Sequence, residues 1–120
     1  MKNIICLLAI CLLLAYGCLD YLVIKKPVLV LEGVSGEDKI WLSGCYGQVS
    51  GYIKNTGNTD AENVEITCTA KQEGATVGNT TKNIGALSTG SQVPFSIEVD
   101  TDCLKGAVTY SCNAKCNNCQ

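Results

Sequence analysis

The stretch Val64–Lys71, with the sequence VEITCTAK, decides the fold class of this chain. Apolar and polar side chains alternate along it, which is the pattern of a β-strand with one dry face and one face in water. The dry face carries Val64, Ile66, Cys68 and Ala70. A strand that is dry on one side only is typical of an antiparallel sheet, so the stretch predicts such a sheet with a cysteine in its core.

Further short segments with strand character lie on both sides of this one. They cover residues 28–31, 40–54, 76–84, 93–99 and 107–114. Polar residues outnumber apolar ones in 76–84, and Pro94 in 93–99 cannot donate a ladder hydrogen bond. We therefore expect both of these segments at sheet edges.

Turn residues separate the segments, at 33–38, 55–58, 73–74 and 87–91. Roughly seven short strands spaced in this way predict an all-β fold, an immunoglobulin-like antiparallel β-sandwich. Within 40–54 one parity is expected to face the core, and it comprises Trp41, Cys45, Val49 and Ile53. In 107–114 the inward parity includes Cys112.

The N-terminal segment is an unbroken apolar run that ends at Cys18, with the small residues Ala15 and Gly17 before it. This pattern predicts a hydrophobic signal or anchor helix over 1–17, lipid attachment at Cys18, a tether over 18–27 and a domain over 28–120. An ordinary cleaved signal and an uncleaved anchor that continues through Ile24 remain alternatives. Each of them places the domain on the extracytoplasmic side, and the lipid or the anchor holds it at the cell membrane.

The nine cysteines fit an exported protein. Cys6 and Cys11 lie inside the apolar run, and Cys18 is the lipidation candidate. The others form an even set: Cys45, Cys68, Cys103, Cys112, Cys116 and Cys119. An even set in a short exported domain predicts a disulfide framework.

The last four cysteines also offer an alternative. Cys103, Cys112, Cys116 and Cys119 could hold zinc or an iron–sulfur cluster as thiolates, and the pair Cys116 and Cys119 could act in thiol redox chemistry. Only that pair is closely spaced, however, and an oxidising compartment favours disulfides. The disulfide framework is therefore the main prediction, and no cofactor is expected.

Charge and composition exclude several functions. The chain has a net charge of −2, and it contains no arginine and no histidine. A nucleic acid partner is not expected, because phosphate binding relies on a basic face and on arginine. The commonest general base is also missing, so no catalytic residue is predicted. Asn79 begins an Asn-Thr-Thr glycosylation sequon.

Several short motifs resemble a known type of domain. The segments 49–57 (VSGYIKNTG), 61–67 (AENVEIT), 84–90 (IGALSTG) and 93–95 (VPF) are similar to the FxLYD and CARDB-type β-sandwich domains of prokaryotic surface proteins. The resemblance covers about 45–110 and implies a sandwich fold at a cell surface. The chain departs from the pattern at 68–72, where a cysteine replaces a core aromatic residue. We expect Cys68 to form a crosslink across the core, with Cys112 or Cys45.

These observations predict a non-catalytic, membrane-tethered extracytoplasmic module. Its partners would be the membrane, through Cys18 or an anchor, and an envelope component or protein. A metal-binding or thiol redox protein that uses the C-terminal cysteines is the alternative.

Overall fold

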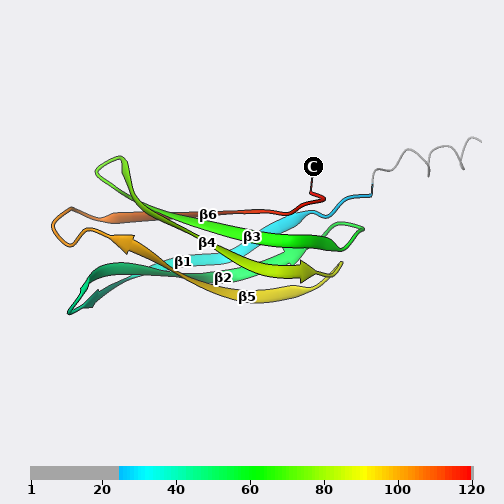
Figure 1. The fold of residues 1–120 in the computed structure, drawn as a ribbon, viewed down its shortest axis with the longest axis horizontal. Coiled ribbons are helices and arrows are strands. Elements are labelled where there is room, and N and C mark those ends of the chain that lie inside the picture. Colours follow the sequence, from blue (N-terminus) through cyan, green and yellow to red (C-terminus); the bar gives the residue numbers. More distant parts are fainter. Residues whose placement is uncertain (1–24, 120) are drawn as a thin grey trace, which may run out of the picture.

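The computed structural model describes residues 25–119, which form six strands and no helix (Figure 1). The strands are β1 (Leu29–Trp41), β2 (Gly44–Asn55), β3 (Ala61–Gln72), β4 (Ala75–Leu87), β5 (Gln92–Thr101) and β6 (Val108–Lys115). They build two antiparallel three-stranded sheets, in the orders β1-β2-β5 and β4-β3-β6. The predicted all-β antiparallel class is confirmed.

The two sheets pack face to face over one apolar core. β2 and β5 supply one side, and β3 supplies most of the other. The buried side chains are Val49, Ile53, Phe95, Ile97 and Val99 from the first sheet, and Ala61, Val64, Ile66, Cys68, Ala70 and Leu87 from the second. Burial of one large aliphatic side chain contributes about 1.5–3 kcal/mol, so the alternating inner faces hold the sheets together.

The lateral sides of the sandwich are formed by edge strands. β4 lies across from β5 on one side, and β1 lies across from β6 on the other. Segment 76–84 falls in β4 and Pro94 falls in β5, so both predicted edge positions are confirmed. The outward positions of β5 can tolerate Pro94 because no further strand pairs there.

The start of the domain departs from the sequence prediction. The expected turn over 33–38 is wrong, because β1 continues through it and pairs with β2 from Leu29 to Trp41. A register shift between Glu32 and Ser35 accommodates the irregular residues as a bulge, and Gly33 adopts a φ of 61° there. Glycine reaches this left-handed region without steric cost.

The chain turns instead after Trp41, at residues 42–43. Trp41 therefore ends β1 and is exposed, so the prediction that it faces the core together with Val49 and Ile53 is wrong. The parity argument failed because it treated 40–54 as one strand, whereas a turn restarts the alternation at Gly44.

Three disulfides are present: Cys45–Cys103, Cys68–Cys112 and Cys116–Cys119. The predicted framework is confirmed, and Cys68 pairs with one of its two expected partners. Its bond does not cross the core, however. β3 and β6 are neighbours in one sheet, Cys68 lies directly opposite Cys112, and their Cα atoms are 4.1 Å apart.

The N-terminal predictions concern a part of the chain that lies outside residues 25–119. This applies to the signal or anchor helix over 1–17, to lipidation at Cys18 and to most of the tether. Within the described residues, no helix is long and apolar enough to cross a membrane.

Candidate interaction site at the distal tip

The chain enters the domain at one end of the sandwich. Pro27 is buried, and the backbone at Lys26 passes so close to Gly57 that a Cβ there would overlap it. The end of β6 lies at this same end (Figure 1), and the Cys116–Cys119 disulfide directly follows that strand. We call it the proximal end.

The opposite end lies roughly 40 Å away, because β1 advances about 3.3 Å per residue from Leu29 to Trp41. It consists of the β1–β2 turn, the β3–β4 turn and the β5–β6 loop (Figure 1). The domain therefore presents these three connections away from the point where the chain enters.

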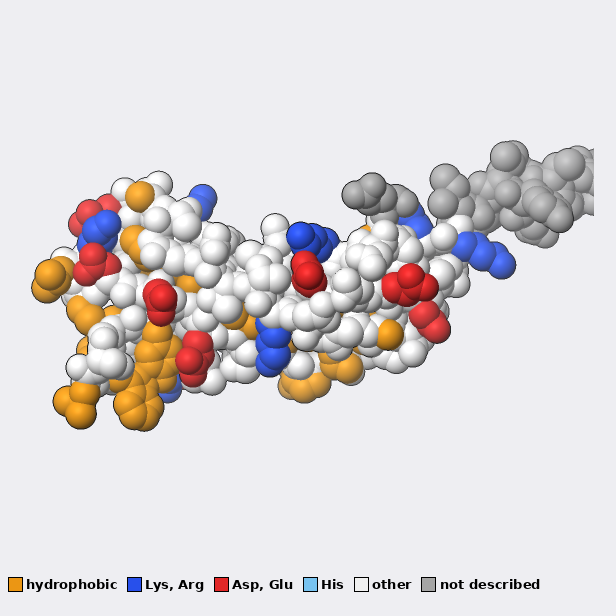
Figure 2. Space-filling view, viewed as in Figure 1, with side chains coloured by type: hydrophobic (Ala, Val, Ile, Leu, Met, Phe, Trp, Pro, Cys, Tyr) orange, Lys and Arg blue, Asp and Glu red, His pale blue; other side chains and the backbone are white. Residues whose placement is uncertain are grey.

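Four apolar side chains protrude at this end. They are Ile40, Trp41, Leu42 and Leu104, which are exposed by 83%, 63%, 109% and 96%. We call this set the distal tip. Figure 2 shows hydrophobic side chains gathered at the left end of the molecule, which corresponds to this tip. A group of exposed large apolar side chains stabilises no core, and such groups commonly mark interaction sites.

The distal tip is held in place by a disulfide and by a buried amide. Cys45–Cys103 ties the start of β2 to the β5–β6 loop, with the Cα atoms 5.4 Å apart. Gln72 is buried at the end of β3, and its Nε2 donates to the carbonyl oxygens of Asp102 and Gly106, each at 2.9 Å. The Asp102 N–H donates back to Gln72 Oε1 at 2.8 Å. The loop that carries Leu104 is therefore ordered before any partner binds, which lowers the entropy cost of binding.

Tyr110 of β6 supports the β1–β2 hairpin from the other sheet. Its ring lies against Gly36 and Gly47, where a Cβ on either glycine would overlap it. Its hydroxyl donates a hydrogen bond to Asp38. Burial, together with the hydrogen bond to the Asp38 carboxylate and the charge of that group, raises the pKa of Tyr110 well above its usual range. The hydroxyl of Tyr110 therefore keeps its proton, and its hydrogen bond to Asp38, to a higher pH than an ordinary tyrosine would.

A hollow of about 360 Å³ adjoins the distal tip on the outer face of the β1-β2-β5 sheet. Trp41, Tyr46, Glu98 and Asp100 line it together with the backbone around Gly44. The Nε1–H of Trp41 donates a hydrogen bond to the Tyr46 hydroxyl. The hollow thus combines two aromatic rings with two carboxylates.

The cysteines of the alternative hypothesis are not assembled into one site. Cys103, Cys112, Cys116 and Cys119 are distributed over the three disulfides, and a disulfide sulfur is not a thiolate ligand. Among residues 25–119, no group of three or more histidine, cysteine or acidic side chains could hold a metal ion. The arrangement therefore provides structural crosslinks.

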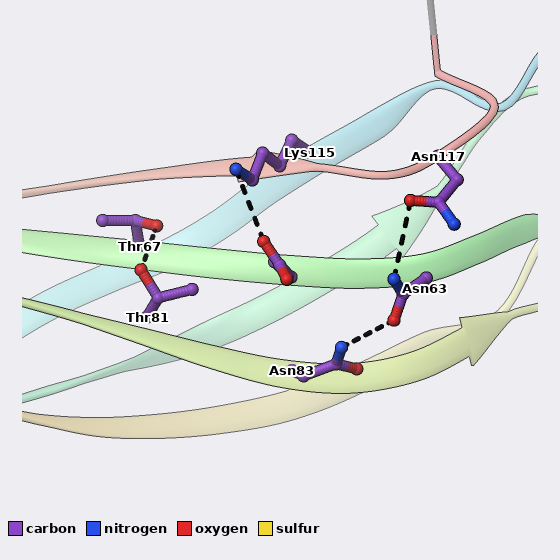
Figure 3. A network of polar contacts seen from close by, with 7 residues as sticks. Asn63, Thr67, Thr81, Asn83, Lys115 and Asn117 are labelled. Atoms are coloured by element: carbon purple, nitrogen blue, oxygen red, sulfur yellow. Dashed lines mark hydrogen bonds and ion pairs between the residues drawn. The ribbon is translucent and has the colours of Figure 1, made fainter.

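The C-terminal pair fastens the tail to the proximal end. Cys116–Cys119 closes a short loop, and the Asn117 N–H donates to the Glu62 carbonyl oxygen at 2.9 Å. Asn118 exchanges hydrogen bonds with the backbone of Asp60 and Glu62. Figure 3 shows how the contact continues, from Asn117 through Asn63 to Asn83.

The remaining predicted site residue is Asn79, which is exposed in the edge strand β4. Sequence reasoning did not predict the distal tip or its hollow. A turn placed at 42–43 would have revealed the exposure of Trp41, but the residues there lack the asparagine–glycine signal of tight hairpins.

None of the models of known protein families matches the chain, and no curated protein is significantly similar to it. The resemblance to FxLYD and CARDB-type domains therefore rests on the short motifs of the sequence.

Proposed function

We propose that this chain is a non-catalytic interaction module, tethered to the cell membrane through its N-terminal segment and exposed on the extracytoplasmic side. The module contacts an envelope protein through its distal tip. The observation that carries this proposal is the position of the exposed side chains of the distal tip, which lie at the end opposite to the one where the chain enters the domain. A contact surface is most accessible to a partner at that end.

The disulfides support an extracytoplasmic location. Such bonds persist in oxidising compartments, whereas the reducing cytoplasm removes them. The apolar run that ends at Cys18 supports export and lipid attachment. Both observations agree with a domain that stands on the outer side of a membrane.

The pairing of the strands supports an immunoglobulin-like fold as the finer architecture. In that fold the second strand pairs with the fifth and the third with the sixth, and here β2 pairs with β5 and β3 with β6. Sandwiches of this type frequently serve as scaffolds for binding surfaces.

The intact mass of the protein from its native membrane tests the tether. We expect a chain that starts at Cys18, carries added lipid mass and lacks two hydrogens for each of the three disulfides. A full-length, fully reduced chain would contradict an extracytoplasmic lipoprotein.

Site-specific crosslinking tests the contact surface. A photoreactive amino acid at Leu42 or at Leu104 is expected to crosslink to the same envelope protein in intact cells. The matched control is Thr56, which is exposed at the proximal end. Equal crosslinking of that protein from all three positions would contradict a specific role for the distal tip.

A further inference from the structure

The hollow beside the distal tip has its own chemistry. Adjacent strands bring its residues together, since Tyr46 of β2 lies directly opposite Asp100 of β5. Glu98 is two residues before Asp100, so both side chains lie on the same outer face, with their Cα atoms roughly 6.5 Å apart along the strand. Trp41, at the end of β1, completes the wall.

The aromatic side chains direct their polar atoms at each other. The indole N–H of Trp41 donates to the hydroxyl oxygen of Tyr46. This bond uses the one donor of the indole, and the Trp41 side chain remains 63% exposed. The face of an aromatic ring, and that of tryptophan most of all, attracts a positive charge.

The carboxylates of the hollow have no cationic partner within residues 25–119. Neither Glu98 nor Asp100 forms an ion pair or a side-chain hydrogen bond there. Lys39 of β1, which lies directly opposite Tyr46, and Lys82 of β4 are both engaged with other groups. Lys39 binds Glu37 at 3.2 Å, and Lys82 donates to the Ser96 carbonyl oxygen at 3.3 Å. The hollow therefore concentrates negative charge beside two aromatic faces.

We propose that this hollow binds an organic cation, an ammonium or guanidinium group, between Trp41 and the carboxylates of Glu98 and Asp100. We identify this group as a lysine or arginine side chain on the surface of the partner protein, and this identification rests on the proposed function. The partner would then pair a basic residue with an apolar patch, which complements the hollow and the distal tip. Opposite charges of this kind orient a partner and raise its rate of association.

Trp41 is the one tryptophan of the chain, so its fluorescence reports directly on the hollow. The purified full chain is titrated with N-acetyl-lysine amide and N-acetyl-arginine amide, and with N-acetyl-norleucine amide as a neutral control of similar shape. We expect a saturable change with both cations and none with the neutral amide. The affinity for one free cation should be on the order of 10 mM or weaker, because exposed cation–π and ion-pair contacts are individually weak.

Charge-removing variants test the assignment of the carboxylates. Glu98→Gln and Asp100→Asn should each weaken binding about two- to fivefold. Glu62→Gln removes an exposed carboxylate at the proximal end, and it should leave binding unchanged. An equal response to norleucine amide, no saturable response, or unchanged binding by the double variant would overturn the proposal.

Two further experiments distinguish a partner's basic residue from a free amine as the bound cation, and they show which of the two proposals fails if only one is correct. The free diamine putrescine is titrated in the same way. If it saturates the fluorescence change at a lower concentration than the lysine amide does, the ligand is a small amine and not a side chain of a partner protein. If crosslinking from Leu42 persists in Glu98→Gln/Asp100→Asn but cation binding was never seen, the cation site fails and the interaction module stands. If cations bind but Leu42 crosslinks to no partner, the module fails and the site stands.

Discussion

At the scale of single residues, glycines and one tyrosine determine how closely the sheets approach. Tyr110 reaches from β6 to the β1–β2 hairpin because Gly36 and Gly47 leave room for its ring. Neither glycine needs a left-handed backbone, so the reason for glycine here is space alone. Tyr110 shares the inward parity that alternation predicted for Cys112, but no local pattern indicated the glycines beneath its ring.

Gly47→Ala tests this contact. The added Cβ would overlap the Tyr110 ring, and overpacking of this kind costs about 1–3 kcal/mol of the free energy of unfolding. Denaturation by urea measures the loss. Gly106→Ala is the matched control, since no heavy atom lies within 4 Å of its Cβ, and it should change stability by less than about 0.5 kcal/mol. Equal stability of both variants would show that the ring does not pack on Gly47.

The raised pKa of Tyr110 predicts a loss of stability at alkaline pH. In the unfolded chain its hydroxyl ionises near pH 10, whereas in the folded protein it keeps its proton to higher pH. Above about pH 10 the unfolded state therefore binds fewer protons, and the free energy of unfolding falls as pH rises. The contribution is fully present below that pH.

Tyr110→Phe identifies the source of this effect. Denaturation at pH 8, 10 and 11 should show a smaller alkaline loss in the variant than in the natural protein, because phenylalanine has no proton to lose. Tyr52→Phe, at an exposed position, should keep the full loss. An identical pH profile in Tyr110→Phe and the natural protein would refute the assignment.

At the scale of elements, the disulfides fasten segments that strand pairing alone holds weakly: a loop, an edge strand and the C-terminal tail. Cys45–Cys103 closes a separation of 58 residues and anchors the β5–β6 loop, while Cys68–Cys112 closes 44 residues and joins β3 to the edge strand β6. Cys116–Cys119 closes only 3 residues. Their energetic contributions should therefore differ.

Removing each disulfide in turn tests that ranking. In the chain-entropy model, loss of Cys45–Cys103 or Cys68–Cys112 costs about 4 kcal/mol, and loss of Cys116–Cys119 costs about 2 kcal/mol. Cys68→Ala/Cys112→Ala should be the most destabilising pair, because Cys68 is fully buried and its replacement also leaves a cavity. Thermal melting of the three double-alanine variants gives the order, and a greater loss for the Cys116–Cys119 pair would contradict it.

At the scale of the whole molecule, the two ends of the sandwich differ in character. The proximal end is dense with polar contacts. There the buried Asn55 accepts hydrogen bonds from the backbone of Val28 and Gly57 and donates to Leu87. The opposite end instead carries the exposed apolar side chains of the distal tip, and Gln72 and the Cys45–Cys103 disulfide hold its β5–β6 loop in place. This difference between the two ends suits an elongated module that is tethered at one end and binds a partner at the other.

Leu42→Ser/Leu104→Ser tests whether the distal tip is independent of the core. Exposed positions contribute little to stability, so the melting temperature should stay nearly constant while retention on a hydrophobic-interaction column decreases. Phe95→Ala, a buried position, is the contrasting control and should cost about 3–5 kcal/mol. Strong destabilisation of the double serine variant would place these leucines in the core.

The sequence by itself determined the all-β class, the inward face of β3, the edge positions of β4 and β5, and the presence of disulfides. These features follow from period-two alternation, from the missing N–H of Pro94 and from an even cysteine set, all of which are local or compositional. The exposure of Trp41 escaped this reasoning, because β1 continues through the expected turn at 33–38 and the chain turns only at 42–43, which restarts the alternation at Gly44.

Only the tertiary structure decided which cysteines pair, where the distal tip lies and what lines its hollow. Cys68 meets Cys112, and Tyr46 meets Asp100, through strand registers between segments more than forty residues apart. Register depends on how two complete apolar faces fit over the common core, and short stretches of sequence do not carry that information. The export that we propose therefore rests on the N-terminal sequence alone, whereas the candidate contact surface could be identified only in the folded chain.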